Sequence, residues 1–214
     1  MTTVRIWFTK AGEASYISLL DLQRVMGRSL KRSRLPVWYT LGFNPHIYMT
    51  FACPLPLGQE SLVECVDVKT EEEASDFTTW VEALNGVMPS GIQVLRVEPA
   101  QMKAAKIAFA RYTVRCHGAQ SAAALDAYNA LETAPVEKKS KRGLKTVDLK
   151  ETVARIEYHM EEDAAVFELL LPAGESFNLN PGLLMDFIRE HCGLESHPSI
   201  LRTALLTEDK QDFC

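Results

Sequence analysis

Two residues in one short stretch have side chains that could act chemically on a substrate. The stretch Gly42–Gly58, GFNPHIYMTFACPLPLG, holds His46, a candidate general acid or base, and Cys53, a candidate nucleophile. Cys53 has no activating partner beside it in the sequence, so we expect a buried and inert thiol. A single histidine after Asn-Pro more often fixes a loop by hydrogen bonds. His46 is therefore a weak catalytic candidate, and a rigid turn is the alternative interpretation of the stretch.

Charge is distributed unevenly along the chain. The formal net charge is −5 over 214 residues, which argues against a globally basic nucleic-acid binder. Two segments are nevertheless basic, and local patches decide electrostatic partners. The first lies on a predicted helix and comprises Arg24, Arg28, Lys31 and Arg32. The second, KKSKRGLK, comprises Lys138, Lys139, Lys141, Arg142 and Lys145. Between them, from Glu60 to Glu82, acidic residues predominate.

The two basic segments favour contact with a polyanion. Like charges four residues apart destabilise an isolated helix by about 0.2–0.5 kcal/mol per pair, and bound phosphates relieve that repulsion. The second segment has no apolar period, so we expect a loop or hairpin tip that contacts phosphates or stacks on a base. For the helix, the alternative is a solvated basic face paired with the acidic residues 71–76. For the second segment, the alternative is a solvated mobile loop.

Aromatic residues are frequent near the first basic segment. They are Trp7, Phe8, Tyr16, Trp38, Tyr39, Phe43, Tyr48 and Phe51. Exposed aromatic rings on a sheet can stack on unpaired bases, although most of these eight rings are expected in the core. Phe43, Asn44 and His46 are candidate RNA contacts, because Asn44-Pro45 stiffens the corner that carries them.

The cysteine content indicates a reducing compartment. The five cysteines are an odd number, widely spaced, with no CxxC pair and no histidine at metal-ligand spacing. We therefore expect free thiols, no metal and no cofactor. The segment MTTVRIWFTKAGE has no apolar run long enough for a signal peptide, and no stretch approaches the roughly 20 apolar residues of a membrane helix. A soluble cytoplasmic protein is the expectation.

Residues 1–100 predict one domain of alternating strands and helices. Strands are expected at Val4–Lys10, Leu35–Thr40, Ile47–Ala52, Leu62–Lys69 and Ile92–Pro99, and helices at Ser18–Ser33 and Ser75–Val87. Ser18 is the expected N-cap of the first helix, and Leu19, Leu22, Met26 and Leu30 its buried stripe. This order is the split βαβ arrangement called ferredoxin-like, with an added hairpin.

Residues 101–214 predict a second domain with the same order. Strands are expected at Lys106–Cys116, Thr146–Glu161, Ala164–Pro172 and Ser199–Glu208, and helices at Ser121–Ala134, capped by Ser121, and Asn180–Gly193. A turn is expected at Glu162–Asp163. The predicted fold class is therefore α+β, with two tandem ferredoxin-like halves that each carry an antiparallel sheet.

Three segments resemble a known family. ISLLDLQR (Ile17–Arg24), RSLKRSRLPVWYTLGFNPHIYMTFACPLPLGQES (Arg28–Ser61) and KRGLKTVDL (Lys141–Leu149) resemble the radical SAM-linked protein family, a bacterial family of unknown function. Its members are fused to, or encoded beside, cobalamin-binding radical SAM proteins. The chain departs from the family pattern at Leu19, where the family has histidine, and at Ile47, where it has proline. It lacks the CxxxCxxC signature of an iron–sulfur cluster.

The residues and the resemblance lead to three functional hypotheses. The first is a non-catalytic RNA-binding module that works with a radical SAM partner on tRNA or rRNA, in which the GFNPH hairpin forms one wall of the RNA-facing surface. The second is an RNA-acting enzyme, like an endoribonuclease or a pseudouridine synthase, that uses His46, Tyr39 and Tyr48. The third is a protein-interaction scaffold for the radical SAM partner, docked through the acidic face Glu71–Asp76, with Glu71, Glu72 and Glu73 as the residues whose charge reversal tests it.

Overall fold

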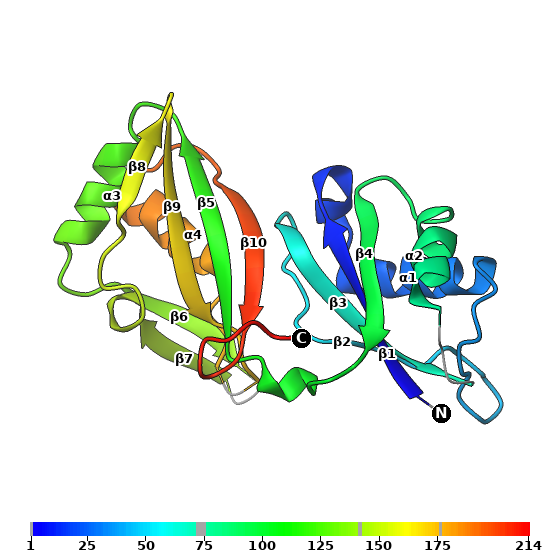
Figure 1. The fold of residues 1–214 in the computed structure, drawn as a ribbon. Coiled ribbons are helices and arrows are strands. Elements are labelled where there is room, and N and C mark those ends of the chain that lie inside the picture. The colour runs from blue at the N-terminus through cyan, green and yellow to red at the C-terminus, as the bar shows by residue number, and fades with distance from the viewer. Residues whose placement is uncertain (1, 72–75, 141–142, 176) are drawn as a thin grey trace.

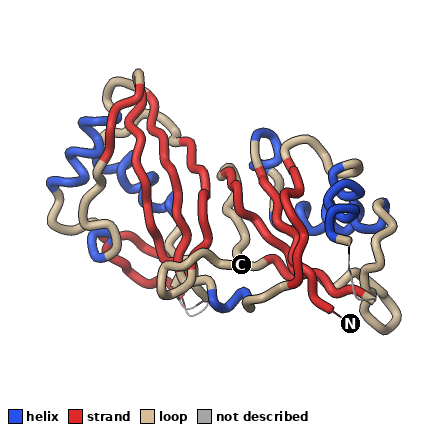
Figure 2. Tube along the Cα trace, in the orientation of Figure 1, coloured by secondary structure: helices blue, strands red, loops and turns tan. Residues whose placement is uncertain are grey.

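One β-sheet runs through both halves of the chain. The computed structural model describes residues 2–71, 76–140, 143–175 and 177–214. In this part of the chain, eight strands form one sheet with the path β4-β1-β3-β10-β5-β9-β8, and β2 also pairs with β3. Residues 2–100, the first half, lie on one side of the β3–β10 junction, and residues 101–214, the second half, lie on the other (Figures 1 and 2).

The element order is the same in the two halves, apart from one inserted hairpin. The first half contains β1 (Thr2–Lys10), α1 (Leu19–Arg32), β2 (Met49–Phe51), β3 (Glu60–Thr70), α2 (Phe77–Asn85) and β4 (Ile92–Pro99). The second half contains β5 (Phe109–His117), α3 (Ser121–Ala130), β6 (Pro135–Ser140), β7 (Gly143–Asp148), β8 (Tyr158–Glu161), β9 (Ala164–Pro172), α4 (Pro181–Cys192) and β10 (Ser199–Leu206). Short 3-10 helices are η1 (Gly12–Tyr16), η2 (Ala104–Lys106) and η3 (Leu149–Glu151). The strands β6 and β7 form a separate two-stranded sheet.

The helices pack on one face of the sheet and leave the other face without helices. Side chains alternate along a strand, so Val4, Ile6 and Phe8 of β1 join the core beneath α1 and α2. α1 contributes Leu22, Met26 and Leu30 to this core, as expected, but Leu19 is exposed. The core beneath α3 and α4 of the second half is continuous with Trp7, Cys53 and Cys65 of the first half. We call the opposite side of the sheet the open face.

The two halves meet where β3 and β10 pair in parallel. The paired residues are Leu201 with Glu60 and Arg202 with Ser61. The other strand pairs in the described part of the chain are antiparallel. The sequence predicted a separate antiparallel sheet in each half, whereas the structure joins the strands of both into one mixed sheet. The fold is α+β, with a mostly antiparallel sheet and four α-helices in the described residues.

Most of the predicted elements are confirmed, some with the same boundaries. β4 and β9 match the predicted ranges. The side chain of Ser18 caps α1 by accepting from the backbone N–H of Asp21, and Asn180 caps α4. The turn at Glu162–Asp163 is present, with Glu162 at φ 54°. At these three positions, the capping and turn chemistry was readable from the local sequence.

The predicted strand Thr146–Glu161 is wrong. The chain instead forms β7, η3 and β8. Asp148 causes the break, because its carboxylate accepts from the backbone N–H groups of Ala134 (2.8 Å) and Lys150 (2.9 Å). The backbone N–H of Ile156 then donates to the side-chain oxygen of Asn129 (2.8 Å) instead of joining a ladder. The alternation of apolar residues here reflects burial without a strand.

Three other predicted elements need correction. The segment Leu35–Thr40 makes isolated bridges in place of a strand, Val37 with Thr70 and Tyr39 with Ile47, because Pro36 has no N–H to donate. Ser121 does not cap α3: the N-cap is Gln120, and the buried hydroxyl of Ser121 has no hydrogen-bond partner among the described residues. The predicted strand Lys106–Cys116 begins only at Phe109, after η2.

Candidate nucleic-acid interface

The corner GFNPH is a closed loop held by the ring of His46. Tyr39 pairs with Ile47, and the backbone N–H of Thr40 donates to the carbonyl of His46 at 2.8 Å. His46 Nδ1 lies 3.0 Å from Thr40 Oγ1 and 3.2 Å from the carbonyl oxygen of Asn44. Because a carbonyl only accepts, Nδ1 carries the proton. The ring therefore fixes the loop, as the sequence predicted for a histidine in this position.

The loop residues 41–46 are all exposed. Phe43 projects fully into solvent, and Leu41 is 91% exposed. Large apolar side chains with this exposure are uncommon, and they mark contact surfaces when they cluster. Phe43, Asn44 and His46 thus lie together on a protruding corner.

An aromatic pair with a lysine lies beside this corner. The rings of Trp38 and Tyr48 contact edge to face, with centroids 6.4 Å apart. The Nζ atom of Lys69 lies 5.3 Å from the Trp38 ring centroid and 4.6 Å from that of Tyr48. Val37 and Ile47, their sequence neighbours, are buried in the helix-side core. By alternation, Trp38 and Tyr48 belong to the open face.

Lys69 was missed as a site residue because it lies in an acidic stretch. Two carboxylates of that stretch do not face a partner molecule, because they form internal ion pairs. Glu64 pairs with Arg202, and Asp67 pairs with Arg5. With these two carboxylates neutralised inside the protein, Lys69 is a cation beside two aromatic rings. The sequence spacing of Trp38, Tyr48 and Lys69 does not predict this contact.

The basic residues of α1 lie on its solvent side. Arg24, Arg28, Lys31 and Arg32 are all exposed. Arg24 pairs with Asp21 at 2.9 Å, and Lys31 Nζ lies 5.9 Å from the Tyr39 ring centroid. The end of α1 that carries Lys31 thus contacts the base of the exposed loop. We call α1, the loop 41–46 and the group of Trp38, Tyr48 and Lys69 the first-half edge.

The second basic segment does form a hairpin, but far from α1. β6 and β7 pair directly, with Lys138 opposite Lys145. Figure 1 shows this hairpin and α1 at opposite ends of the molecule. Lys138 donates to the carbonyl of Asn178 and lies over the Phe177 ring; burial, followed by the charge of Lys145, lowers its pKa. Lys139 is on β6, and Lys141 and Arg142 lie outside the described residues, as do Glu72 and Glu73 of the acidic segment.

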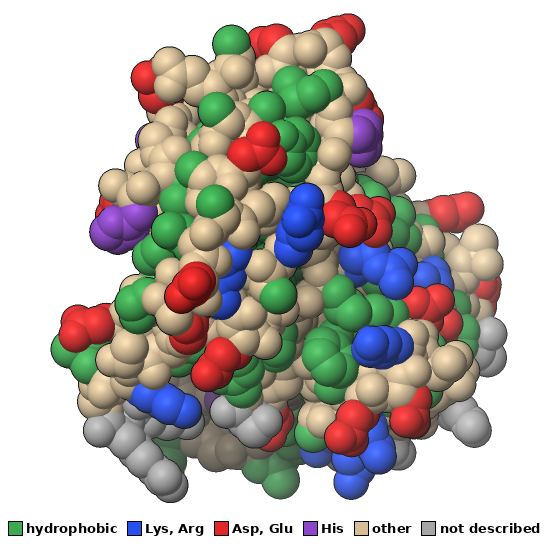
Figure 3. All heavy atoms as spheres, turned by 90° about the vertical axis from the view of Figure 1, so that its left-hand side faces the viewer, with side chains coloured by type: hydrophobic (Ala, Val, Ile, Leu, Met, Phe, Trp, Pro, Cys, Tyr) green, Lys and Arg blue, Asp and Glu red, His purple; other side chains and the backbone are tan. Residues whose placement is uncertain are grey.

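The two basic segments therefore do not form one groove. On the face of the second half shown in Figure 3, basic and acidic side chains are interspersed among the coloured residues. A polyanion bound to α1 does not reach the β6–β7 hairpin without crossing the molecule.

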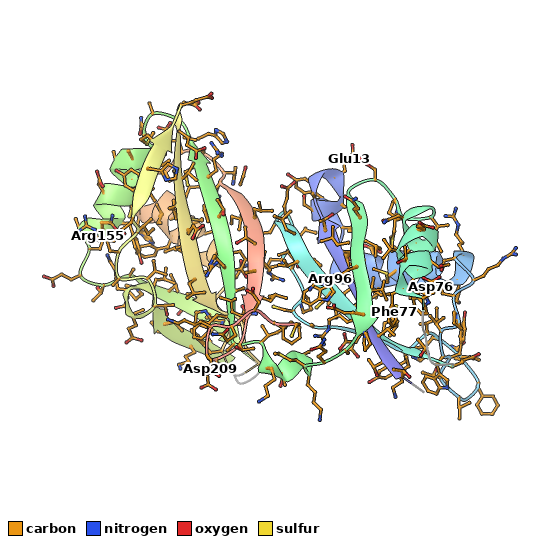
Figure 4. All side chains as sticks on the ribbon, in the orientation of Figure 1. Glu13, Asp76, Phe77, Arg96, Arg155 and Asp209 are labelled. Atoms are coloured by element: carbon orange, nitrogen blue, oxygen red, sulfur yellow. The ribbon has the colours of Figure 1, made fainter. Side chains whose placement is uncertain are left out.

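Several of the predicted aromatic residues belong to the interior. Phe8 is fully buried, and its ring contacts Phe51 edge to face. Trp7 is also buried but faces the other side of β1, where its Nε1 donates to Glu98 at 2.7 Å. The guanidinium of Arg96 lies 4.3 Å from the centroid of a Trp7 ring, and Figure 4 places Arg96 on β4 beside the space between the halves. Trp7 and Phe8 are thus buried away from any base that could stack on them.

A second polar group lies on the open face of the second half. His159 Nε2 lies 2.9 Å from Glu161 Oε1, and Arg115 donates to the other oxygen of this carboxylate. The bond to His159, then that to Arg115, lowers the pKa of Glu161. His159 and Glu161 line a hollow of about 620 Å³ that Arg155 and Glu168 also line. Sequence reasoning missed this group, because Arg115 lies on β5 and is distant in the sequence from His159 and Glu161 on β8.

The described part of the chain contains neither a metal site nor a membrane-spanning helix. No group of three or more histidine, cysteine, aspartate or glutamate side chains there is placed to hold a metal ion. No helix in those residues has the length and apolarity needed to cross a membrane.

A comparison with known protein families gives a match to this chain. No curated protein matches the chain. A family model matches residues 3–181, which include the GFNPH corner, α1, the β6–β7 hairpin and the β3 strand at the junction. The family is described as an uncharacterized protein conserved in bacteria. On this match, the chain belongs to the family of uncharacterized proteins conserved in bacteria called DUF2344.

Proposed function

We propose that this protein binds single-stranded RNA through its first-half edge. The observation that carries the proposal is the contact of Lys69 with the rings of Trp38 and Tyr48 on the open face. Aromatic rings on a helix-free sheet surface stack on unpaired bases, and a neighbouring cation attracts the phosphates. The exposed ring of Phe43 extends this surface at the corner.

The charges of α1 support the same assignment. Within the described residues, its exposed Arg28, Lys31 and Arg32 form no ion pair with a carboxylate, whereas Arg24 is paired with Asp21. Lys31 lies over Tyr39 on the helix side of the sheet, so a strand that stacks on Trp38 and Tyr48 reaches α1 by passing around the loop 41–46 at the edge of the sheet. The β6–β7 hairpin is left out of the binding surface, because it lies at the other end of the molecule.

The proposal includes the fold type and a protein partner. The first half has the strand order β4-β1-β3-β2, and the second has β10-β5-β9-β8. Both orders support two tandem ferredoxin-like units, divided near residue 100.

The exposed Leu41 and Phe43 also suit contact with a protein, and the family resemblance makes a radical SAM protein in the cytoplasm the proposed partner.

A role in binding is favoured over catalysis at His46. Both contacts of its Nδ1 atom are with the loop itself, at Thr40 and Asn44. The ring of Tyr39 contacts Lys31, and the ring of Tyr48 contacts Trp38. Among the described residues, neither tyrosine hydroxyl is hydrogen-bonded to His46. If labelled RNA is cleaved or modified by the wild type and not by His46→Ala, the enzyme hypothesis replaces this proposal.

The direct test is the affinity for a fluorescein-labelled single-stranded RNA of about 20 nucleotides, measured by anisotropy at low salt. We expect Trp38→Ala and Tyr48→Ala each to weaken binding by about 1–3 kcal/mol, while Tyr48→Phe, which keeps the ring, binds nearly as the wild type does. Leu144→Ala is the matched control, because Leu144 is also exposed but lies on β7. Absence of binding by the wild type, or equal binding by all four variants, contradicts the proposal.

A further inference from the structure

A cavity lies at the junction of the two halves, beside η1, which directly precedes α1 in the chain. Its volume is about 400 Å³, within the range of small-molecule pockets. One wall comes from the first half, with Tyr16 at the end of η1 and the loop Leu57–Gln59. The other wall comes from α4 and from the residues that lead into β10. The ring of Tyr16 stands against Gly58, whose backbone N–H donates to the carbonyl of Ser15 at 2.9 Å.

One residue of this lining, Gln59, carries a buried hydrogen-bond acceptor without a partner among the described residues. Gln59 is 4% exposed. Its Nε2 donates to the side-chain oxygen of Asn180 at 2.7 Å, but its Oε1 is buried without a partner among the described residues. Leaving such an acceptor unpaired costs about 1–3 kcal/mol. A ligand that donates a hydrogen bond to Gln59 recovers this free energy.

A donor lies on the opposite side of the lining. Arg189 Nη1 lies 2.8 Å from His197 Nδ1, and its Nη2 donates to Asp186 at 2.9 Å. Because a guanidinium only donates, His197 Nδ1 accepts, and the proton of the neutral ring is on Nε2. His197 thus offers an N–H donor, and Asp186 offers a carboxylate acceptor beside it.

The remaining lining residues are mainly apolar or aromatic. Leu57, Met185, Pro198 and Ile200 supply the apolar surface. The ring of Tyr16 is 73% exposed and can cover a planar ligand. A planar group that has both hydrogen-bond donors and acceptors on its edge fits this combination. An anion without hydrogen-bond donors does not, because the Asp186 carboxylate and the Gln59 side-chain oxygen would repel it.

We propose that this cavity binds a single nucleobase. The base stacks on Tyr16, donates to Gln59 and accepts from His197. The inference rests on the proposed function in that the base belongs to the bound RNA strand. Tyr16 lies shortly before α1 in the chain, so a strand that leaves the cavity can continue along the exposed side of this helix, past Arg24 and Arg28.

The test uses the full chain and free mononucleotides, so that it does not depend on the first-half edge. AMP, GMP, CMP and UMP are titrated separately, with ribose 5-phosphate as the ligand without a base. Binding is followed by the NMR shifts of the Gln59 side-chain amide and the His197 ring. We expect saturable shifts with at least one nucleotide and none with ribose 5-phosphate.

Variants separate this inference from the proposed function. Tyr16→Ala and His197→Ala should each weaken nucleotide binding at least about fivefold, and Tyr16→Phe should bind as the wild type does. Trp38→Ala should leave nucleotide binding unchanged while it weakens RNA binding. Equal shifts with ribose 5-phosphate, or nucleotide binding that Tyr16→Ala and His197→Ala do not change, overturn the nucleobase site. RNA binding that is sensitive to Trp38→Ala, without nucleotide shifts at Gln59, overturns this inference alone.

Discussion

Arg202 and Glu64 form an ion pair in the interior, at the junction of the two halves. Their closest atoms are 2.9 Å apart, and the side chains are 2% and 3% exposed. Arg202 also donates to the carbonyl of Cys53 at 2.6 Å. Burial alone would lower the pKa of Arg202, but the Glu64 carboxylate, with smaller effects of Tyr112 and Cys53, raises it above its ordinary value. The pair holds β10 against β3 at the short stretch where these strands join.

Removing one member of this pair should destabilise the protein strongly. We expect Arg202→Met to lower the free energy of unfolding by about 3–5 kcal/mol, because it leaves the Glu64 carboxylate buried without its partner. The double variant Arg202→Met, Glu64→Leu should regain most of that free energy. Urea unfolding measures both. Arg24→Met, which breaks an exposed pair, is the control and should change little; an equally small effect of Arg202→Met would show that the buried pair does not join the halves.

The sequence predicted local structure better than it predicted long-range contacts. Ser18 and Asn180 cap helices through contacts two or three residues away, so their roles follow from local spacing. Arg202 and Glu64 are 138 residues apart, and no local pattern pairs them. The alternation in Thr146–Glu161 failed for the same reason, because Asp148 is bound to Ala134 across a turn. A single joined sheet was therefore outside the reach of the sequence.

The candidate site was predictable in its parts and not in its arrangement. Helical spacing correctly placed Arg28 and Lys31 on the exposed side of α1. It could not place the β6–β7 hairpin at the opposite end of the molecule. The group of Trp38, Tyr48 and Lys69 depends on the segment around Val37, which pairs antiparallel with the end of β3 at Thr70. Such a pairing between distant residues is set by tertiary packing.

The two basic segments should differ in their effect on the salt dependence of RNA binding. Replacing Arg28 and Arg32 by glutamine should reduce the slope of log K against log salt by about 0.7 for each phosphate that the helix no longer neutralises. Replacing Lys138 and Lys145 in the same way removes equal charge at the other end of the molecule and should leave the slope unchanged. Anisotropy titrations at several salt concentrations give the slopes. Equal slopes for both double variants would mean that α1 does not touch the strand.

The cysteines should differ in reactivity. Cys53, Cys65 and Cys116 are buried, and Cys192 and Cys214 are half-buried. Burial raises the pKa of Cys65 and of Cys116 to about 12, so near pH 8 only about one thiol in ten thousand is a thiolate. We expect Ellman's reagent at pH 8 to modify at most Cys192 and Cys214 before urea is added, and all five cysteines afterwards. Mass spectrometry of the modified peptides identifies them; early modification of Cys65 contradicts the burial of β3.

The stability at acid pH should depend on the caps of α1 and α2. Hydrogen bonds from Ser18 and then Arg24 lower the pKa of Asp21, and bonds from Thr79 lower that of Asp76. Their stabilising effect is present above the unfolded pKa, about 3.9, and disappears as the pH falls through the folded values. The variant Asp21→Asn, Asp76→Asn should therefore show a smaller fall in Tm between pH 5 and pH 2 than the wild type.

The matching variant is Thr79→Val, which keeps the backbone N–H but removes the hydroxyl that bonds to Asp76. It should raise the pKa of Asp76, so that the fall in stability begins at higher pH than in the wild type. Thermal unfolding followed by circular dichroism measures both variants. If Tm falls with decreasing pH in both variants as it does in the wild type, protonation of Asp21 and Asp76 does not contribute to the loss of stability at acid pH.

Gly91 should tolerate no side chain, because β4 begins against the 3-10 helix η1. Its φ is +81°, and a Cβ added there would lie 2.4 Å from the carbonyl oxygen of Ala11 and 2.8 Å from the Cβ of Ala14. The backbone N–H of Ala11 donates to the Gly91 carbonyl at 2.8 Å, so the two segments cannot separate freely. Gly193 is the matched control, with φ +78° and open space around its Cβ position. Gly193→Ala should cost about 1–2 kcal/mol for the backbone conformation alone. Gly91→Ala should cost clearly more in urea unfolding, and equal costs would show that η1 does not pack against the start of β4.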